Sequence, residues 1–261
     1  MFERFTDRAR RVVVRAQEGH GVGSLGNHGS VVAAATVSGP EPARRGLLRC
    51  GAAAGPLFVS VFLIEGARRP GYKPLRHPVS SLSLGPRGWV QVANFATTGM
   101  LYLAGATGLA RSPGQAACSR ITAAALGATG LGLLGSAMFR TDPVSGYPPG
   151  TPDAPAKITA TGTMHNFAAV PIFLGIPAAA FACAWRFQRS GRPRWAAYSA
   201  ATGASMLTTT RLFGAGFNQD PRLVNYAGLF QRAAIVTGFS WLTALSIRAS
   251  LTGKTTARIR L

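Results

Sequence analysis

The sequence predicts an all-α fold: a polytopic membrane helix bundle with six transmembrane helices and both termini in the cytoplasm. Three observations lead to this prediction. Hydrophobic residues make up 47% of the 261 residues, whereas charged residues make up 14%, against roughly 25% in a soluble domain. The apolar residues are gathered in long runs, and basic residues flank these runs on one side more than on the other.

Six apolar segments each approach the roughly 20 residues that a helix needs to cross a bilayer. They lie at 47–64, 89–110, 121–139, 165–185, 195–213 and 228–247. A backbone in hydrocarbon must satisfy its own hydrogen bonds, which favours helices, and no period-2 alternation indicates a barrel. The third and fifth segments are the weakest, because Gly, Ala, Ser and Thr replace larger apolar residues there.

The third segment is rich in glycine, and two interpretations of this stay open. Gly127, Gly130, Gly132 and Gly135 are candidate contact points between helices, because small residues let backbones approach closely inside a membrane bundle. Alternatively, the small residues reflect only a genome that is rich in Ala, Gly and Arg codons.

Basic residues set the predicted orientation. There are 28 lysines and arginines against 8 acidic residues, for a formal net charge of +20. The short connection 186–194 is strongly basic, as are both tails, and an excess of bases marks the cytoplasmic side. Arg211 and Arg232 are expected near the membrane ends, with side chains that extend to the interface.

The chain divides into three predicted parts. Residues 1–45 are expected to form a basic N-terminal helix and a flexible linker, residues 46–250 the transmembrane domain, and residues 251–261 a short basic cytoplasmic tail. The first apolar run begins too far from the start for a signal peptide. Residues 1–18 are similar to the first helix of the N-terminal domain of Clp-family ATPases. That similarity includes no nucleotide-binding loop, so it implies no ATPase activity.

Polar residues gather on the side predicted to be outer. Beyond residue 45, all acidic residues and histidines are expected to fall in the outer connections. They are Glu65, His77, Asp142, Asp153, His165 and Asp220. The two longest outer connections, about 65–88 and 140–164, are stiffened by prolines. Binding or chemistry is therefore expected at the outer membrane face.

The candidate polar site consists of His77, Arg140, Asp142 and His165. A histidine carries protons near neutral pH, a carboxylate can orient it, and an arginine can hold an anionic head group with two hydrogen bonds. In the alternative interpretation these residues are structural. Asp142 then pairs with Arg140 and caps a turn before Pro143, while His165 caps or staples the start of the fourth segment.

Other site types are not indicated. His77 and His165 lack the spacing of metal ligands, so no metal and no cofactor are predicted. No GxSxG surrounds Ser80, Ser81 or Ser83, and the glycine-rich stretch GATGLGLLG contains no GK[ST]. Cys50, Cys118 and Cys183 are too scattered for a disulfide framework and are expected to act as small apolar residues. The bases flank apolar runs rather than a polar, aromatic-bearing face, which argues against nucleic acid as a partner.

Four stretches of the chain, taken in order, carry a family resemblance. They read HPVSSLSLGPRGWVQVANF, FRTDP, HNFAAVPIFLGIPAAAF and GLFQRAAIVTGFSWLTAL. Together they resemble a bacterial multi-pass membrane family catalogued as domain of unknown function 998, over about residues 46–250. The resemblance implies a helical membrane domain and no established activity.

The predicted function is that of an integral protein of the cell membrane that binds a membrane lipid or small apolar molecule at the outer face. The alternative is an intramembrane enzyme that acts on a lipid or isoprenoid-like substrate, with the outer His, Asp and Arg residues as its titratable groups. A small transporter is a third class. Pro171 and Pro177 interrupt the fourth segment, but no second broken segment answers them as transporter repeats require.

Overall fold

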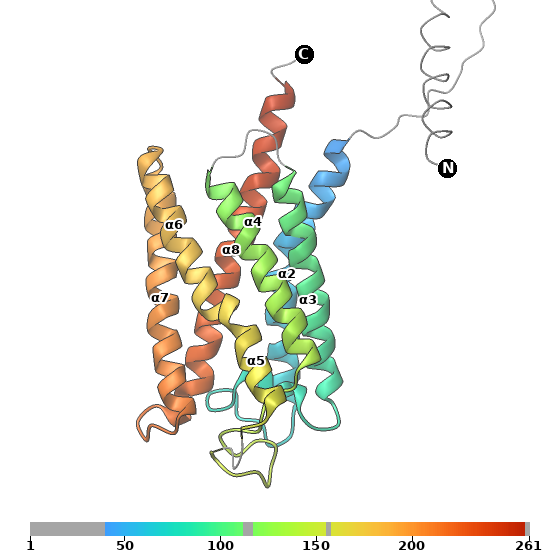
Figure 1. Cartoon of the computed structure of the whole chain (residues 1–261), viewed down its shortest axis with the longest axis vertical. Helices are drawn as coiled ribbons and strands as arrows, with labels where there is room; N and C mark the ends of the chain where they lie inside the picture. Colours follow the sequence, from blue (N-terminus) through green and yellow to red (C-terminus); the bar gives the residue numbers. More distant parts are fainter. Residues whose placement is uncertain (1–39, 112–116, 155–157, 259–261) are drawn as a thin grey trace, which may run out of the picture. The chain divides into compact units, whose positions relative to one another are not determined.

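The computed structural model describes residues 40–111, 117–154 and 158–258, and these residues form an antiparallel helix bundle (Figure 1). The long helices are α2 (Pro40–Arg68), α3 (Gly88–Ala110), α4 (Ala117–Met138), α5 (Ala160–Val170), α6 (Ile176–Arg189), α7 (Pro193–Phe217) and α8 (Ala227–Arg258). A π-helical turn, η2 (Pro171–Gly175), joins α5 and α6 into one rod, and η1 (Val79–Ser83) and η3 (Val224–Tyr226) are short 3-10 turns. The predicted helix at 1–18 lies outside the described residues.

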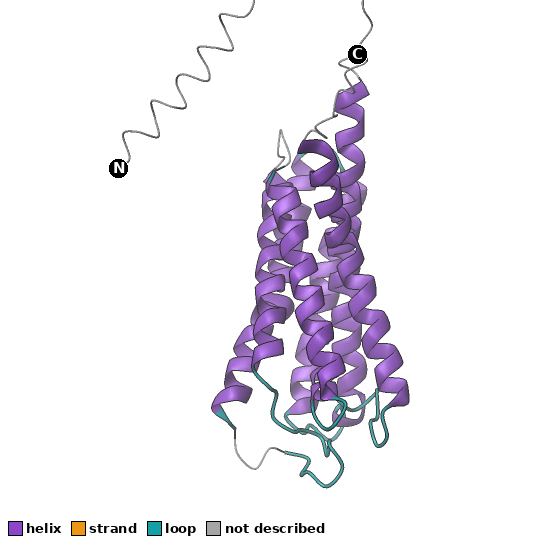
Figure 2. Ribbon diagram, turned by 90° about the vertical axis from the view of Figure 1, so that its right-hand side faces the viewer, coloured by secondary structure: helices purple, strands orange, loops and turns teal. Residues whose placement is uncertain are grey.

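The rods form a closed ring. Helices that follow each other along the chain pack side by side, and α8 closes the ring against α2. Figures 1 and 2 show the rods running up and down with nearly parallel axes. The connections 69–87, 139–154 and 218–226 lie together at one end, which we call the loop end. The α6–α7 connection lies at the opposite end, which we call the turn end.

In the described part of the chain, four rods are long and apolar enough to cross a membrane: Pro42–Arg68, Cys118–Met138, Ala160–Arg189 and Val224–Leu251. Because α2 and α4 run in the same direction, α3 must return across the membrane between them, and α7 returns in the same way between α6 and α8. Large apolar side chains also cover the outside of the ring, including Leu63, Ile64 and Leu131, which are more than half exposed. The chain is thus a polytopic helical membrane protein.

Helices α3 and α7 are not among these four rods because polar residues lower their mean hydropathy. Gln91, Asn94 and Thr98 of α3 are buried, and the Asn94 amide donates to the Phe58 carbonyl oxygen of α2 at 3.2 Å. In α7 the Ser199 hydroxyl accepts from Trp241 Nε1 of α8 at 3.0 Å. Polar side chains that face the ring interior bond between helices and do not meet lipid. The sequence picked out segments three and five as weak; the helix of segment three is nevertheless among the four candidate spans, whereas those of segments two and five are not.

Glycine contacts bring α4 close to its neighbours, as one interpretation of the third segment predicts. A Cβ on Gly130 would lie 2.8 Å from the Gly99 carbonyl oxygen of α3, and one on Gly135 would lie 2.8 Å from the Ala168 Cβ of α5. A Cβ on Gly132 would meet the Ala168 carbonyl oxygen even more closely. The contact role is confirmed for these three. A Cβ on Gly127 would lie 3.8 Å from the Ala106 Cβ of α3, an ordinary van der Waals contact that does not require a glycine.

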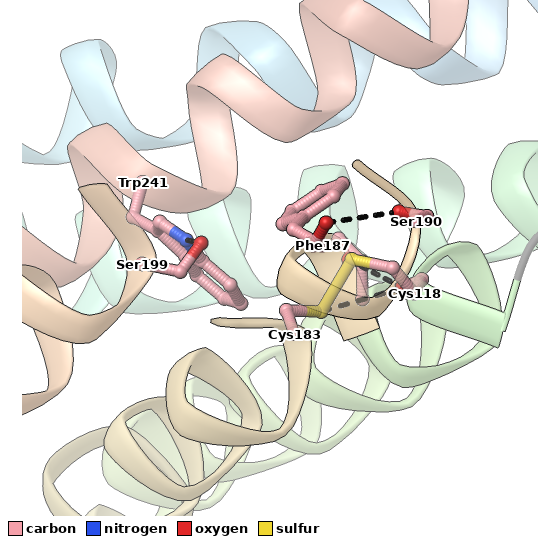
Figure 3. The surroundings of a disulfide bond; sticks show 7 residues. Cys118, Cys183, Phe187, Ser190, Ser199 and Trp241 are labelled. Atoms are coloured by element: carbon pink, nitrogen blue, oxygen red, sulfur yellow. Dashed lines mark hydrogen bonds between the residues drawn. A yellow bond between two sulfur atoms is a disulfide. The ribbon is translucent and has the colours of Figure 1, made fainter. Parts of the chain in front are cut away.

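Two cysteines form a disulfide, contrary to the expectation that all three act as small apolar residues. Cys118 in the first turn of α4 and Cys183 in α6 have their Cα atoms 5.2 Å apart and are buried (Figure 3). They are 65 residues apart in the sequence and meet only because α6 packs on α4, which spacing does not reveal. Cys50 is free.

The disulfide lies near the turn end, which the basic residues predict to be cytoplasmic. Disulfides are rare in reducing compartments, and burial of both sulfurs is what would protect this one.

On a Cys50→Ala background, we expect a membrane-impermeant maleimide to label Ala154→Cys at the loop end in intact cells. Gln188→Cys at the turn end should react only after permeabilisation. The reverse pattern would place the turn end outside.

Candidate functional site

Arg76 joins the three connections of the loop end. Its Nε donates to the Ser145 carbonyl oxygen at 3.1 Å, its Nη2 pairs with Asp153 Oδ1 at 2.7 Å, and its Nη1 donates to Asn225 Oδ1 at 2.7 Å. One side chain thereby contacts residues 69 to 149 positions away in the sequence. The loop end is therefore a connected cap over the helices.

Arg232 in the second turn of α8 stabilises this cap from the side of the helices. The guanidinium donates to three backbone carbonyl oxygens, those of Pro74, His77 and Gly228, and to the Tyr72 hydroxyl. Arg232 is 9% exposed, so the expectation that it extends to the membrane interface is wrong. The reason is that its turn of α8 faces the ring interior, where the folded first connection presents carbonyl oxygens that need a donor.

His77 is held by the backbone on both sides of its ring. Nδ1 accepts from the Lys73 N–H at 2.9 Å, and Nε2 lies 3.1 Å from the Ser145 carbonyl oxygen, so the neutral ring carries its proton on Nε2. Burial lowers the pKa of His77 to about 4, and burial also raises the pKa of the neighbouring Tyr72 to about 12. Of the four predicted site residues, His77 is thus a structural one.

Acidification is expected to loosen the loop end through His77. Its usual pKa is 6.5, so the unfolded chain takes up a proton near that pH, whereas the folded chain does so only near pH 4. Stability is therefore full above pH 6.5 and falls, by up to about 3 kcal/mol, as the pH drops toward 4. Thermal unfolding of the wild type and His77→Gln across this range measures the effect. An equal pH dependence in both proteins contradicts it.

Asp142 does not pair with Arg140, although the structural interpretation expected this. Arg140 is exposed, and within the described ranges no salt bridge joins it to Asp142. The carboxylate instead covers the first turn of α5, where the Thr159 N–H and hydroxyl donate to its two oxygens at 3.0 and 2.7 Å. It leaves no space for a Cβ on Gly162. A carboxylate is favoured at this position because the N-terminus of a helix carries partial positive charge.

His165 lies in the second turn of α5 and is 5% exposed. Its Nδ1 donates to the Phe139 carbonyl oxygen at 2.9 Å, and its ring packs edge-on against Phe95. It does not cap the helix, because α5 begins at Ala160 and Thr159 accepts from the Gly162 N–H. The interaction with Phe139 instead joins α5 to the end of α4.

A cavity of about 500 Å³ lies inside the ring toward the loop end, and Asp142 and His165 both line it. Its deeper wall is aromatic and aliphatic, formed by Phe58, Leu133, Ile172, Phe173, Phe213 and Phe239. Its wall near the loop end is polar and includes Ser80, Asp142, His165, Asn166, Asn218 and Gln231. The structure therefore brings two of the four predicted residues to one site, and places His77 and Arg140 elsewhere.

The cavity is open toward the membrane between α5 and α7. Val170 and Leu174 line it and are 44% and 53% exposed. Below η2 the α5 rod leans over α4, whereas α6 lies beside α7 (Figure 1). The π-turn begins at Pro171, which has no N–H for a regular helix bond. Next to it, the Phe173 and Phe213 rings meet with centroids 4.8 Å apart. The bent rod thus leaves a lateral entrance.

The cavity lies entirely within the part of the chain that resembles a known protein family. The family described as Protein of unknown function (DUF998) matches residues 52–248. The chain belongs to this family. The family membership predicted from the four sequence stretches is confirmed, and every residue that lines the cavity of this DUF998 protein lies inside the matched range. No match was found among curated proteins or among solved structures.

Several cavity residues of this DUF998 protein were missed by the sequence analysis. Gln231, Asn166 and Thr210 each lie in an apolar segment, and a polar residue in a membrane segment is a candidate functional residue by default. That signal was present in the sequence for all three. The pairing of Phe173 with Phe213 had no sequence signal, because it depends on the bend at η2.

Proposed function

We propose that this DUF998 protein binds a lipid or small apolar molecule in the cavity near the loop end. The observation that carries the proposal is an apolar cavity whose entrance residues, Val170 and Leu174, face the membrane. Its volume lies within the roughly 300–1,000 Å³ usual for small-molecule sites. The proposal takes the membrane to be the cell membrane and the loop end to be outside.

The wall of the cavity supports a bound molecule on physical grounds. Lining side chains that are only partly covered by protein, such as Phe173, Phe213 and Leu174, lose dispersion contacts wherever no partner atoms face them. Water does not replace these contacts well, because an apolar wall offers it too few hydrogen bonds. An apolar ligand that enters from the bilayer restores them, and it need not cross water to arrive.

A side chain that fills the cavity tests the proposal. Ala169 lines the cavity on α5, so Ala169→Trp is expected to remove the space for a ligand. Ala178 is exposed on the outside of α6, so Ala178→Trp adds the same side chain outside the cavity. Mass spectrometry of small molecules that co-purify with each protein should show one compound with the wild type and Ala178→Trp that Ala169→Trp lacks. Equal amounts in all three proteins contradict binding in this cavity.

An intramembrane enzyme is the second candidate, favoured by the position of His165 and Asp142 on the same cavity. Because Nδ1 donates to a carbonyl oxygen, Nε2 of the neutral ring is an acceptor, as a general base requires. His165→Ala and Asp142→Ala should then leave the protein folded and abolish conversion of the bound molecule. If the wild type and both variants all carry the same unconverted compound, binding alone is the function.

A further inference from the structure

The polar wall of the cavity indicates which head group the ligand carries. We infer that the ligand is an uncharged amphiphile, with a hydroxyl or carbonyl head near the loop end and an apolar chain in the deeper part. This inference rests on the proposed function and narrows it: it excludes phospholipids, fatty acids and long-chain amines.

No cationic side chain lines the cavity in the described part of the chain, where Asp142 is the one charged residue of the wall. The nearby arginines are engaged elsewhere: Arg232 donates to backbone carbonyl oxygens and Arg76 pairs with Asp153. Arg140, which the sequence analysis assigned to an anionic head group, is exposed and does not line the cavity. A phosphate or carboxylate head would be desolvated without a counter-charge, which is costly.

The N-terminus of α5 offers no anion site either. Such a helix end normally attracts phosphate through its free N–H groups and its dipole. Here the Asp142 carboxylate already covers it, bonded to the Thr159 N–H and hydroxyl. The same contacts limit what Asp142 offers to a cation, because each carboxylate oxygen already accepts a hydrogen bond. The helix end offsets part of the Asp142 charge, and their mutual contacts leave neither group free for a charged head.

The remaining polar groups suit a head that both donates and accepts hydrogen bonds. Thr210 Oγ1 is buried and has no partner among the described residues, and Thr210 lines the cavity. Asn166 and Asn218 carry amides in the wall near the loop end, each with a donor and an acceptor. A hydroxyl or carbonyl complements these groups, and it leaves the lipid bilayer at a much smaller desolvation cost than a charged head.

Three probes with the same chain length test the inference: monopalmitoylglycerol, its phosphate ester lysophosphatidic acid, and hexadecylamine. Each is titrated into the full-length protein in a maltoside detergent, and bound probe is measured by native mass spectrometry. Monopalmitoylglycerol should bind at least about tenfold more tightly than either charged probe, a difference of about 1.4 kcal/mol. Its binding should be lost in Ala169→Trp and kept in Ala178→Trp.

The outcomes separate the inference from the proposed function. If lysophosphatidic acid or hexadecylamine binds as tightly as monopalmitoylglycerol, and Ala169→Trp abolishes that binding, the head-group inference is wrong and the cavity remains a binding site. If Ala169→Trp changes the binding of none of the three probes and no compound co-purifies with the wild type, the proposed function itself fails.

Discussion

Arg232→Ala is expected to lower the free energy of unfolding by about 3 to 5 kcal/mol, one of the two largest effects expected of a single substitution. The guanidinium supplies hydrogen bonds to the carbonyl oxygens of Pro74, His77 and Gly228 and to the Tyr72 hydroxyl. Without it, carbonyl oxygens of the first connection lose their donor in a buried position, and each such loss costs about 1 kcal/mol or more. Alanine also leaves a void against Phe62 and Tyr72, whose rings the guanidinium covers.

Thermal unfolding of the detergent-solubilised protein, followed by tryptophan fluorescence, measures this loss. Arg211→Ala is the matched control, because Arg211 is exposed on α7 and its removal should change stability by no more than about 0.5 kcal/mol. Arg232→Lys should recover little, since a lysine cannot present the planar fork that reaches several acceptors at once. Equal stability of Arg232→Ala and Arg211→Ala would show that the cap does not depend on this residue.

The helices were predictable because the bilayer imposes a simple rule on the sequence, a run of about 20 apolar residues for each crossing. Their bounds were not. The structure begins α2 at Pro40 and ends α8 at Arg258, beyond the predicted segments 47–64 and 228–247. Hydropathy reports the part of a helix that meets lipid, whereas the hydrogen-bonded backbone continues through the basic residues that follow.

The candidate site was half predictable for a similar reason. Asp142 and His165 stand at the edges of two apolar segments that pack together, so helix packing alone brings them near each other. The position of His77 depends on the path of the first connection. That path is fixed by contacts such as Arg232 with the His77 carbonyl oxygen, 155 residues apart. Neither periodicity nor spacing encodes contacts of this kind.

Glu65→Gln is expected to cost about 3 to 5 kcal/mol, comparable to the loss of Arg232. The sequence analysis placed Glu65 in an outer connection, but it lies in the last turn of α2 and is 3% exposed. Its carboxylate accepts from Arg69 Nη2 at 2.7 Å and from Arg87 Nη2 at 2.9 Å. Arg69 is buried as well, so the substitution leaves an uncompensated charge inside the protein.

The variants around Glu65 separate charge from hydrogen bonding. Arg87 has a side chain that is 55% exposed, so Arg87→Ala should cost no more than about 1 kcal/mol. Replacing the buried pair by Glu65→Leu with Arg69→Met removes both charges, a change that is often neutral for an isolated pair. Here it should restore only part of the stability lost in Glu65→Gln, because Arg69 also donates to the carbonyl oxygens of Leu82 and Leu84. Full recovery in the double variant, measured by the same thermal unfolding, would show that the charge alone matters.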